Sequence, residues 1–303
     1  MAPDTSGTAP FGHMLTAMVT PMTPEGEVDL DGAAALATHL VDVLGNDGLI
    51  VNGTTGESPT LRDTEKIQTL RVVLDAVGDR ASIVTGAGNN DTRHSIEIAR
   101  AAQDAGAHGL LCVTPYYNKP PQPGLAAHFL AIADATDLPI MTYDIPGRTG
   151  TPIQPETFAR LAEHPRIVAN KDAKADIASS AAVIADTGLA WYSGDDALTL
   201  PLLSVGAVGV VSVVGHVLGD RISQMMAAHR AGDVATATRL NASMIAAYVG
   251  MFRTQGVIMA KAALRELGLP SGPVRLPLVD ATPEQVATLR ADLAQAGVPG
   301  FAA

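Results

Sequence analysis

The sequence predicts an α/β fold: a closed (β/α)8 TIM barrel followed by a C-terminal helical extension. Eight short apolar runs rich in β-branched residues alternate with longer stretches of helical periodicity. Three helical stretches with no strand between them come next. The segment after the first run lacks the glycine-rich turn that is typical of an open dinucleotide-binding sheet. A closed barrel therefore explains the order of elements better than an open sheet.

The elements follow one another along the whole chain. The expected strands lie within 14–21, 48–53, 82–88, 109–115, 139–146, 166–173, 189–195 and 209–215. The clearest helical stretches between them are 31–44, 61–77, 91–105 and 122–136. Side chains typical of helix N-caps precede the helices at Asp29, Thr60, Asp91 and Asp176.

Three parts of the chain are expected. Residues 1–11 are predicted to be a disordered tail, residues 12–232 the catalytic barrel, and residues 233–303 the helical extension. Within the extension, helices are expected near 234–251, 255–267 and 283–296.

Composition excludes several classes of protein. The chain has 303 residues, 47% of them hydrophobic, which is enough to bury a large core. Its net charge of −11 argues against nucleic-acid and anionic-membrane partners, which require basic surfaces. The single cysteine, Cys112, precludes an intramolecular disulfide, and no signal peptide or membrane-spanning run is evident. We therefore expect a cytoplasmic protein.

Polar residues gather where the expected strands end, and this is where barrel enzymes place their active sites. The strand ends carry Thr20, Gly53, Thr54, Thr55, Gly56, Glu57, Asn89, Asn90, Tyr116, Tyr117, Tyr143, Arg148, Lys171, Asp172, Ser193, Gly194, Asp195, Asp196, Ser212 and His216.

Lys171 is the first candidate for a catalytic residue, because it ends an apolar strand. Alternation places it on the same face as Ala169 and Ile167. If that face points into the barrel, desolvation lowers the pKa of the amine and makes it a nucleophile suited to Schiff-base formation. The alternative is a structural lysine paired with Asp172 or Glu57.

The other four lysines are expected to be solvated surface charges. They are Lys66, Lys119, Lys174 and Lys261.

Tyr143 and Thr54 could serve the proton transfers that such chemistry needs. A phenol beside an imine can donate and accept a proton, and a threonine hydroxyl can pass it on. Tyrosines that merely pack at the barrel rim are the alternative.

Five motifs, in this order and at these spacings, resemble those of the dihydrodipicolinate synthases. That family belongs to the pyruvate-dependent class I aldolases, which include N-acetylneuraminate lyase. The resemblance covers about residues 12–297, and the family's fold is the predicted barrel with its extension. The motifs are Gly53-Thr-Thr-Gly-Glu-Ser58, Thr114-Pro-Tyr-Tyr-Asn118, Tyr143-Asp-Ile-Pro-Gly-Arg-Thr-Gly150, Lys171-Asp-Ala173 and Ser193-Gly-Asp-Asp196.

The resemblance implies a role for each of four catalytic residues. Lys171 would form the Schiff base with pyruvate, and Tyr143 would donate and accept protons. Thr54 would relay the proton together with Tyr117, which in this family reaches across from a neighbouring subunit.

The resemblance also implies the binding residues, the substrates and the assembly. Thr55 would hold the pyruvate carboxylate, and Arg148 would bind the carboxylate of L-aspartate 4-semialdehyde. Backbone carbonyls near Gly194 and Val211 would line the site. The product would be 4-hydroxy-tetrahydrodipicolinate, on the route to diaminopimelate and lysine. No metal or organic cofactor is implied, and the expected assembly is a homotetramer built as a dimer of dimers.

Two other functions stay open. The first is another pyruvate aldolase that acts on a sugar acid, although the cation Arg148 suits a small carboxylate better. The second is a catalytically silent paralogue that binds a keto acid, which the intact Lys171, Tyr143 and Thr54 disfavour.

Two departures from the family's pattern bear on packing and regulation. Asn170 stands beside the lysine where an aliphatic residue is usual, and alternation points it away from the lumen. Many relatives are inhibited by L-lysine at a cleft between subunits, where this chain has His94 in place of a glutamate and Lys66 in place of a histidine. Ser58, Asn90 and Tyr116 keep the rest of that pocket. We therefore expect little or no inhibition by lysine, unless Asp63 compensates.

Overall fold

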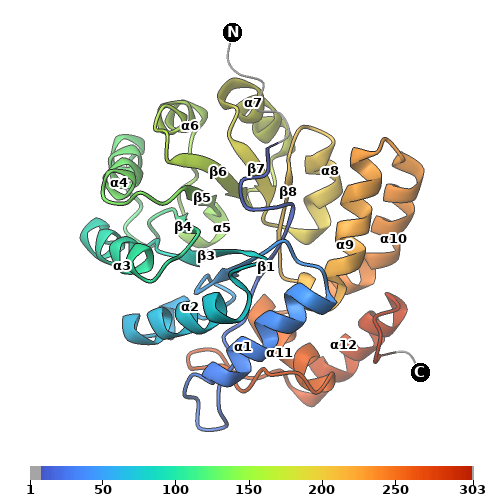
Figure 1. The fold of residues 1–303 in the computed structure, drawn as a ribbon. Coiled ribbons are helices and arrows are strands. Elements are labelled where there is room, and N and C mark those ends of the chain that lie inside the picture. Colours follow the sequence, from blue (N-terminus) through green and yellow to red (C-terminus); the bar gives the residue numbers. More distant parts are fainter. Residues whose placement is uncertain (1–7, 302–303) are drawn as a thin grey trace.

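The computed structural model describes residues 8–301 of the chain. Eight parallel strands pair in sequence order, and β1 closes the barrel on β8 (Figure 1). This confirms the predicted fold class. The strands are β1 Met14–Ala17, β2 Gly48–Val51, β3 Ser82–Gly86, β4 Gly109–Val113, β5 Ile140–Asp144, β6 Ile167–Asp172, β7 Ala190–Ser193 and β8 Gly209–Ser212.

Helices surround the barrel and then continue into the extension (Figure 1). Around the barrel lie α1 Leu30–Thr38, α2 Asp63–Val77, α3 Thr92–Asp104, α4 Gln122–Asp134, α5 Pro146–Thr149, α6 Pro155–Ala162, α7 Ile177–Thr187, α8 Thr199–Leu203 and α9 Gly215–Arg230. The extension holds α10 Val234–Met251, α11 Gly256–Glu266 and α12 Pro283–Gln295. Short turns of π- or 3-10 helix are η1 His39–Val43, η2 Ser58–Thr60 and η3 Asp196–Leu198.

Three of the four predicted caps are confirmed. The side chains of Asp29, Asp91 and Asp176 each accept a hydrogen bond from a backbone N–H in the first turn of the helix that follows. Thr60 is not a cap, because it ends η2 and its hydroxyl donates to the carbonyl of Glu57.

The barrel interior and the layer between strands and helices form separate cores. Inner-face side chains such as Leu15, Ile50 and Leu111 make the interior core. Phe11 belongs to it as well: it is 1% exposed, and its N–H donates to the Tyr192 hydroxyl at 3.4 Å. The predicted disordered tail therefore extended too far, because Phe11 packs inside the barrel. The rest of that prediction, at residues 1–7, lies outside the described residues.

Strand β6 contains an irregularity that alternation alone does not predict. The pairing of β5 with β6 moves from Ile140–Ile167 to Met141–Ala169, which skips one residue of β6. As a result Ile167 packs in the outer core, whereas Ala169 lies in the interior. The expectation that Ile167 shares a face with Lys171 was wrong, and the bulge is the reason.

Asn170 points out of the barrel, as alternation predicts. Its Oδ1 accepts a hydrogen bond of 2.8 Å from the Thr142 hydroxyl on the neighbouring strand.

The extension packs against the last barrel helix. Helix α10 lies along α9, and α12 packs on α10. Arg253, just after α10, forms a bidentate ion pair with Asp292 of α12, at 2.5 and 2.9 Å. None of the helices in the described part of the chain is long and apolar enough to span a membrane.

Candidate active site

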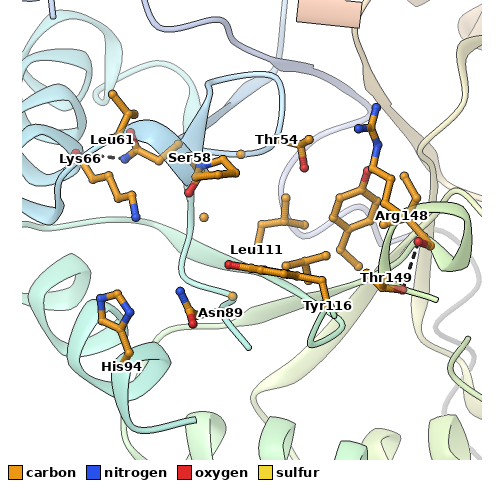
Figure 2. A pocket seen from close by; sticks show the side chains of 18 of the residues that line it. Thr54, Ser58, Leu61, Lys66, Asn89, His94, Leu111, Tyr116, Arg148 and Thr149 are labelled. Carbon is orange, nitrogen blue, oxygen red and sulfur yellow. Dashed lines mark hydrogen bonds between the residues drawn. The ribbon is translucent and has the colours of Figure 1, made fainter. Parts of the chain in front are cut away.

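A cavity of about 730 Å³ opens at the C-terminal ends of β2 to β5. Figure 2 shows two groups of side chains in it, with Leu111 and Tyr116 between them. Thr54 and Arg148 lie at one side, together with Tyr143 in the cavity lining. The other side carries Lys66, Asn89 and His94. We call these the inner side and the outer side of the cavity.

Lys171 is buried among the strand ends, next to Tyr143 of the cavity lining. It pairs in register with Tyr143 of β5, and its ammonium nitrogen lies 4.2 Å from the centre of the Tyr143 ring. Only 5% of the residue is exposed. Burial lowers the pKa of Lys171 to about 7, although Asp196 nearby opposes the shift and Arg148 adds to it. A large share of the amine is therefore neutral near pH 7, and only the neutral amine is a nucleophile.

Neither expected partner of a structural lysine pairs with Lys171. The Asp172 carboxylate faces away from the lumen, where it accepts from the Trp191 indole at 2.9 Å and from the Ser180 hydroxyl. Glu57 forms its ion pair with Lys261 instead, at 2.6 Å. The structural alternative for Lys171 was therefore wrong.

Gly194 gives the lysine its room. A Cβ at this position would lie 3.1 Å from both Cγ and Cε of Lys171, and 3.0 Å from the carbonyl oxygen of Asp172. The backbone after β7 therefore packs directly along the lysine side chain, and a residue larger than glycine would require that side chain to shift.

Tyr143 is buried and remains protonated at neutral pH. Burial raises its pKa to about 12, while Arg148 and a hydrogen bond with the Thr54 side chain counteract part of that shift. The phenol is thus a proton donor beside the Lys171 amine, with a hydroxyl at hand to exchange the proton.

Thr54 and Thr55 stand in a tight turn after β2. The N–H of Glu57 donates to the Thr54 carbonyl at 3.1 Å, and that of Ser58 to the Gly53 carbonyl at 3.2 Å. Thr55 is buried, at 8% exposed, next to the half-buried Thr54.

Arg148 stands on the short helix α5 and is exposed at the mouth of the cavity. Two hydrogen bonds fix the segment around Arg148. The Thr149 hydroxyl donates to the Ile145 carbonyl at 3.1 Å, and the Ile153 N–H donates to the Asp144 carboxylate at 3.2 Å. The guanidinium can therefore meet an anionic group without moving its backbone.

Five of the eight predicted site residues are not among the described residues that line the cavity: Lys171, Thr55, Gly194, Val211 and Tyr117. Val211 is buried on the inner face of β8, at 1% exposed. Tyr117 is 89% exposed, with a left-handed backbone (φ 74°), and it is not among the described residues that line the cavity.

The outer side of the cavity corrects the prediction for Lys66. This residue is 7% exposed, and its ammonium lies 3.3 Å from the Asp63 carboxylate. His94 approaches the same carboxylate at 2.7 Å. Lys66 lies on the same face of α2 as the buried Leu70, Val73 and Val77, so helical spacing is a signal that could have found its burial.

The other three lysines that were expected at the surface differ in their exposure. Lys119 is exposed, as predicted. Lys174 is half-buried and donates to the Ser179 hydroxyl at 3.0 Å, so it is not fully solvated. Lys261 is 1% exposed, against the prediction. The apolar residues on both sides of it in Gly256–Glu266 are a signal that could have found it.

Asp196 is a buried carboxylate whose effect on Lys171 was not predicted. It is 2% exposed and accepts from the Val213 N–H at 3.0 Å and from the Ser212 hydroxyl. Burial raises its pKa to about 6. Its negative charge therefore favours the protonated form of Lys171 at neutral pH.

No group of three or more potential metal-ligating side chains comes together within residues 8–301. The histidine at the end of β8 is structural, since His216 Nε2 accepts from the Val19 N–H at 3.1 Å.

A buried lysine with a lowered pKa, placed against a protonated tyrosine at the strand ends of a (β/α)8 barrel, defines the class of barrels that attack carbonyl groups through an amine. Residues 10–296 match the dihydrodipicolinate synthetase family. The chain belongs to this family.

Individual relatives agree with the family match. The chain is 65% identical to the 4-hydroxy-tetrahydrodipicolinate synthase of Acidothermus cellulolyticus, over 97% of this chain and 95% of that protein. It is 62% identical to 4-hydroxy-tetrahydrodipicolinate synthase 2 of Streptomyces coelicolor, over 98% and 99%. The dihydrodipicolinate synthase of Cyanidioschyzon merolae, solved with lysine bound, superimposes with a TM-score of 0.94 at 45% identity, over 96% of this chain and 99% of that one.

Proposed function

We propose that this chain condenses pyruvate with L-aspartate 4-semialdehyde through a Schiff base on Lys171. The activity is that of its relatives, 4-hydroxy-tetrahydrodipicolinate synthesis, and the enzyme is a lyase. The observation that carries the mechanism is the burial of Lys171 beside Tyr143, at 4.2 Å from its ring centre.

The first half of the reaction makes the imine. The neutral Lys171 amine attacks the carbonyl carbon of pyruvate to give a carbinolamine. Tyr143 then donates its proton to the carbinolamine hydroxyl, which leaves as water, and recovers a proton through Thr54. The N–H groups and hydroxyl of the turn at Thr55 suit the pyruvate carboxylate.

The second half makes the new carbon–carbon bond. Loss of a methyl proton converts the imine to an enamine, whose carbon attacks the aldehyde of the semialdehyde. The amino group of the second substrate then attacks the imine carbon, and the ring closes as Lys171 is released. Arg148, at the mouth of the cavity, would bind the carboxylate of this substrate with two parallel hydrogen bonds.

Neighbouring subunits would complete the site. Tyr117 is exposed on its own chain, which fits a residue donated to another copy, and we propose a homotetramer in which it joins the relay. No metal or organic cofactor takes part in this mechanism, and a cytoplasmic location follows from the biosynthetic role. Backbone carbonyls near Gly194 and Val211 would line the pyruvate site.

Borohydride trapping tests the proposal. With pyruvate, the reductant should fix one three-carbon adduct per chain, which peptide mass spectrometry should place on Lys171. Lys171→Ala should give no adduct while keeping its fold by circular dichroism. An adduct on Lys174, or none on the native enzyme, would overturn the mechanism. Cleavage assays with a panel of sugar acids, which measure the release of pyruvate, would decide the aldolase alternative.

A further inference from the structure

The C-terminal extension holds the active-site turn through one buried ion pair. Lys261 lies in α11, and its ammonium nitrogen lies 2.6 Å from Glu57 Oε1, with each side chain 1% exposed. The same ammonium donates to the Pro273 carbonyl at 2.7 Å. The other carboxylate oxygen of Glu57 accepts from the Arg275 N–H at 2.8 Å. Both oxygens are thus held by the extension.

Glu57 needs such an anchor because of its backbone. It adopts a left-handed conformation, with φ 58°, which is unfavourable for a residue other than glycine and persists only where the surroundings enforce it. Its N–H closes the turn on the Thr54 carbonyl at 3.1 Å. The position of Glu57 therefore decides where Thr54 and Thr55 lie, and the Thr54 side chain is hydrogen-bonded to Tyr143.

The anchoring segment is itself fixed. In Figure 1 the chain after α11 runs beside the loop that precedes α1, and the Met22 N–H donates to the Ser271 carbonyl at 3.1 Å. Gly272 admits no side chain, because a Cβ there would lie 1.9 Å from the Met22 carbonyl oxygen. The Arg275 guanidinium adds bonds of 2.7 and 3.0 Å to Glu65 on α2.

A buried ion pair is a costly way to gain stability, because desolvation of the two charges offsets much of their attraction. What this pair supplies is geometry, since one oxygen of the carboxylate lies in ion-pair contact with Lys261 and the other accepts from the Arg275 N–H. We propose that Glu57 and Lys261 are positioning residues for Schiff-base formation, through which the extension sets the reactivity of the barrel site toward the keto acid. This inference rests on the proposed function.

The test measures the rate of borohydride-trapped adduct formation on Lys171 at saturating pyruvate. Lys261→Met and Glu57→Gln should each slow trapping by about tenfold or more, since misplacement of reacting groups by about 1 Å can cost 100-fold. The KM for the semialdehyde should stay within about twofold, because Arg148 stands on a different loop. A fall confined to the semialdehyde step would overturn the proposal.

The double variant Glu57→Gln/Lys261→Met separates position from stability, and it carries the test if a single variant does not fold. It leaves no unpaired buried charge, so its unfolding temperature should recover relative to the single variants, while trapping should remain slow. Recovery of the trapping rate along with stability would show that the pair is only structural.

Leu293→Ala provides the matched control. Leu293 is fully buried in α12, so its truncation should destabilise the extension without touching the turn. Below its unfolding temperature this variant should trap pyruvate at the native rate, and an equal loss would overturn the proposal. Absence of any Lys171 adduct in the native enzyme would instead defeat the proposed function itself.

Discussion

Lys171 and Tyr143 occupy paired positions on neighbouring strands, with the lysine nitrogen 4.2 Å from the centre of the tyrosine ring. Burial is the largest influence on the pKa of both groups, and it moves the two pKa values in opposite directions. The Lys171 amine is therefore partly neutral near pH 7, whereas the Tyr143 phenol stays protonated. The pair thus brings an amine and a proton donor to the same place.

The free energy of unfolding of the protein should depend on pH because of Lys171. Its pKa is about 7 in the folded state against an ordinary lysine value of 10.5, so between these limits the unfolded chain binds more protons and stability rises with pH. Lys171→Met should remove that penalty, which is on the order of 5 kcal/mol below pH 7. The advantage of the variant over the native enzyme should shrink as the pH approaches 10.

Denaturant unfolding of both proteins between pH 6 and pH 10 measures this difference. Lys119→Met, at an exposed site, serves as the control and should show no such trend. A pH-independent difference for Lys171→Met would mean that the lysine is charged in the folded enzyme throughout.

Tyr143→Phe should slow imine formation while preserving the barrel. The substitution removes the proton donor and its hydrogen bond to Thr54, and general acid–base groups contribute about 100- to 10,000-fold. Trapping kinetics with pyruvate would show the loss. Tyr116→Phe, on the neighbouring loop, is the matched control, and an equal effect there would argue against a specific role for Tyr143.

Arg148→Ala should separate the two substrates. Arg148 is exposed at the cavity mouth, so stability should change little. Pyruvate trapping should stay near the native rate. Loss of a charge-assisted contact to a bound substrate costs on the order of 2–5 kcal/mol, so kcat/KM for the semialdehyde should fall by about 30-fold or more. Normal condensation by the variant would favour the sugar-acid aldolase.

L-lysine at millimolar concentration should inhibit the enzyme little or not at all at pH 8. Asp63, the carboxylate at the outer side of the cavity, already faces both Lys66 and His94, at 3.3 and 2.7 Å. A cationic ligand would have to compete with Lys66 for it. Initial rates across a lysine titration measure this, and inhibition at sub-millimolar lysine would show that the cavity rearranges around Asp63.

Local rules explain what could be predicted of the fold. Short apolar runs rich in β-branched residues and capping aspartates depend on neighbouring residues, so all eight strands and the caps at Asp29, Asp91 and Asp176 could be predicted directly. The prediction of Thr60 as a cap failed because α2 begins only at Asp63, with Arg62 at the N-cap position and Glu65 accepting from its N–H. The Thr60 carbonyl instead accepts from Arg275 at 2.9 Å.

The order of residues along the chain was enough to specify the barrel, the extension and the position of Lys171 beside Tyr143, since a lysine that ends an apolar strand is placed by the strand order. The burial and the protonation of the side chains at the site depend on tertiary contacts. The bulge in β6, the ion pair of Lys261 with Glu57 and the charge of Asp196 near Lys171 arise from contacts between distant segments. Desolvation depends on every atom around a group, and no local pattern of residues encodes that sum.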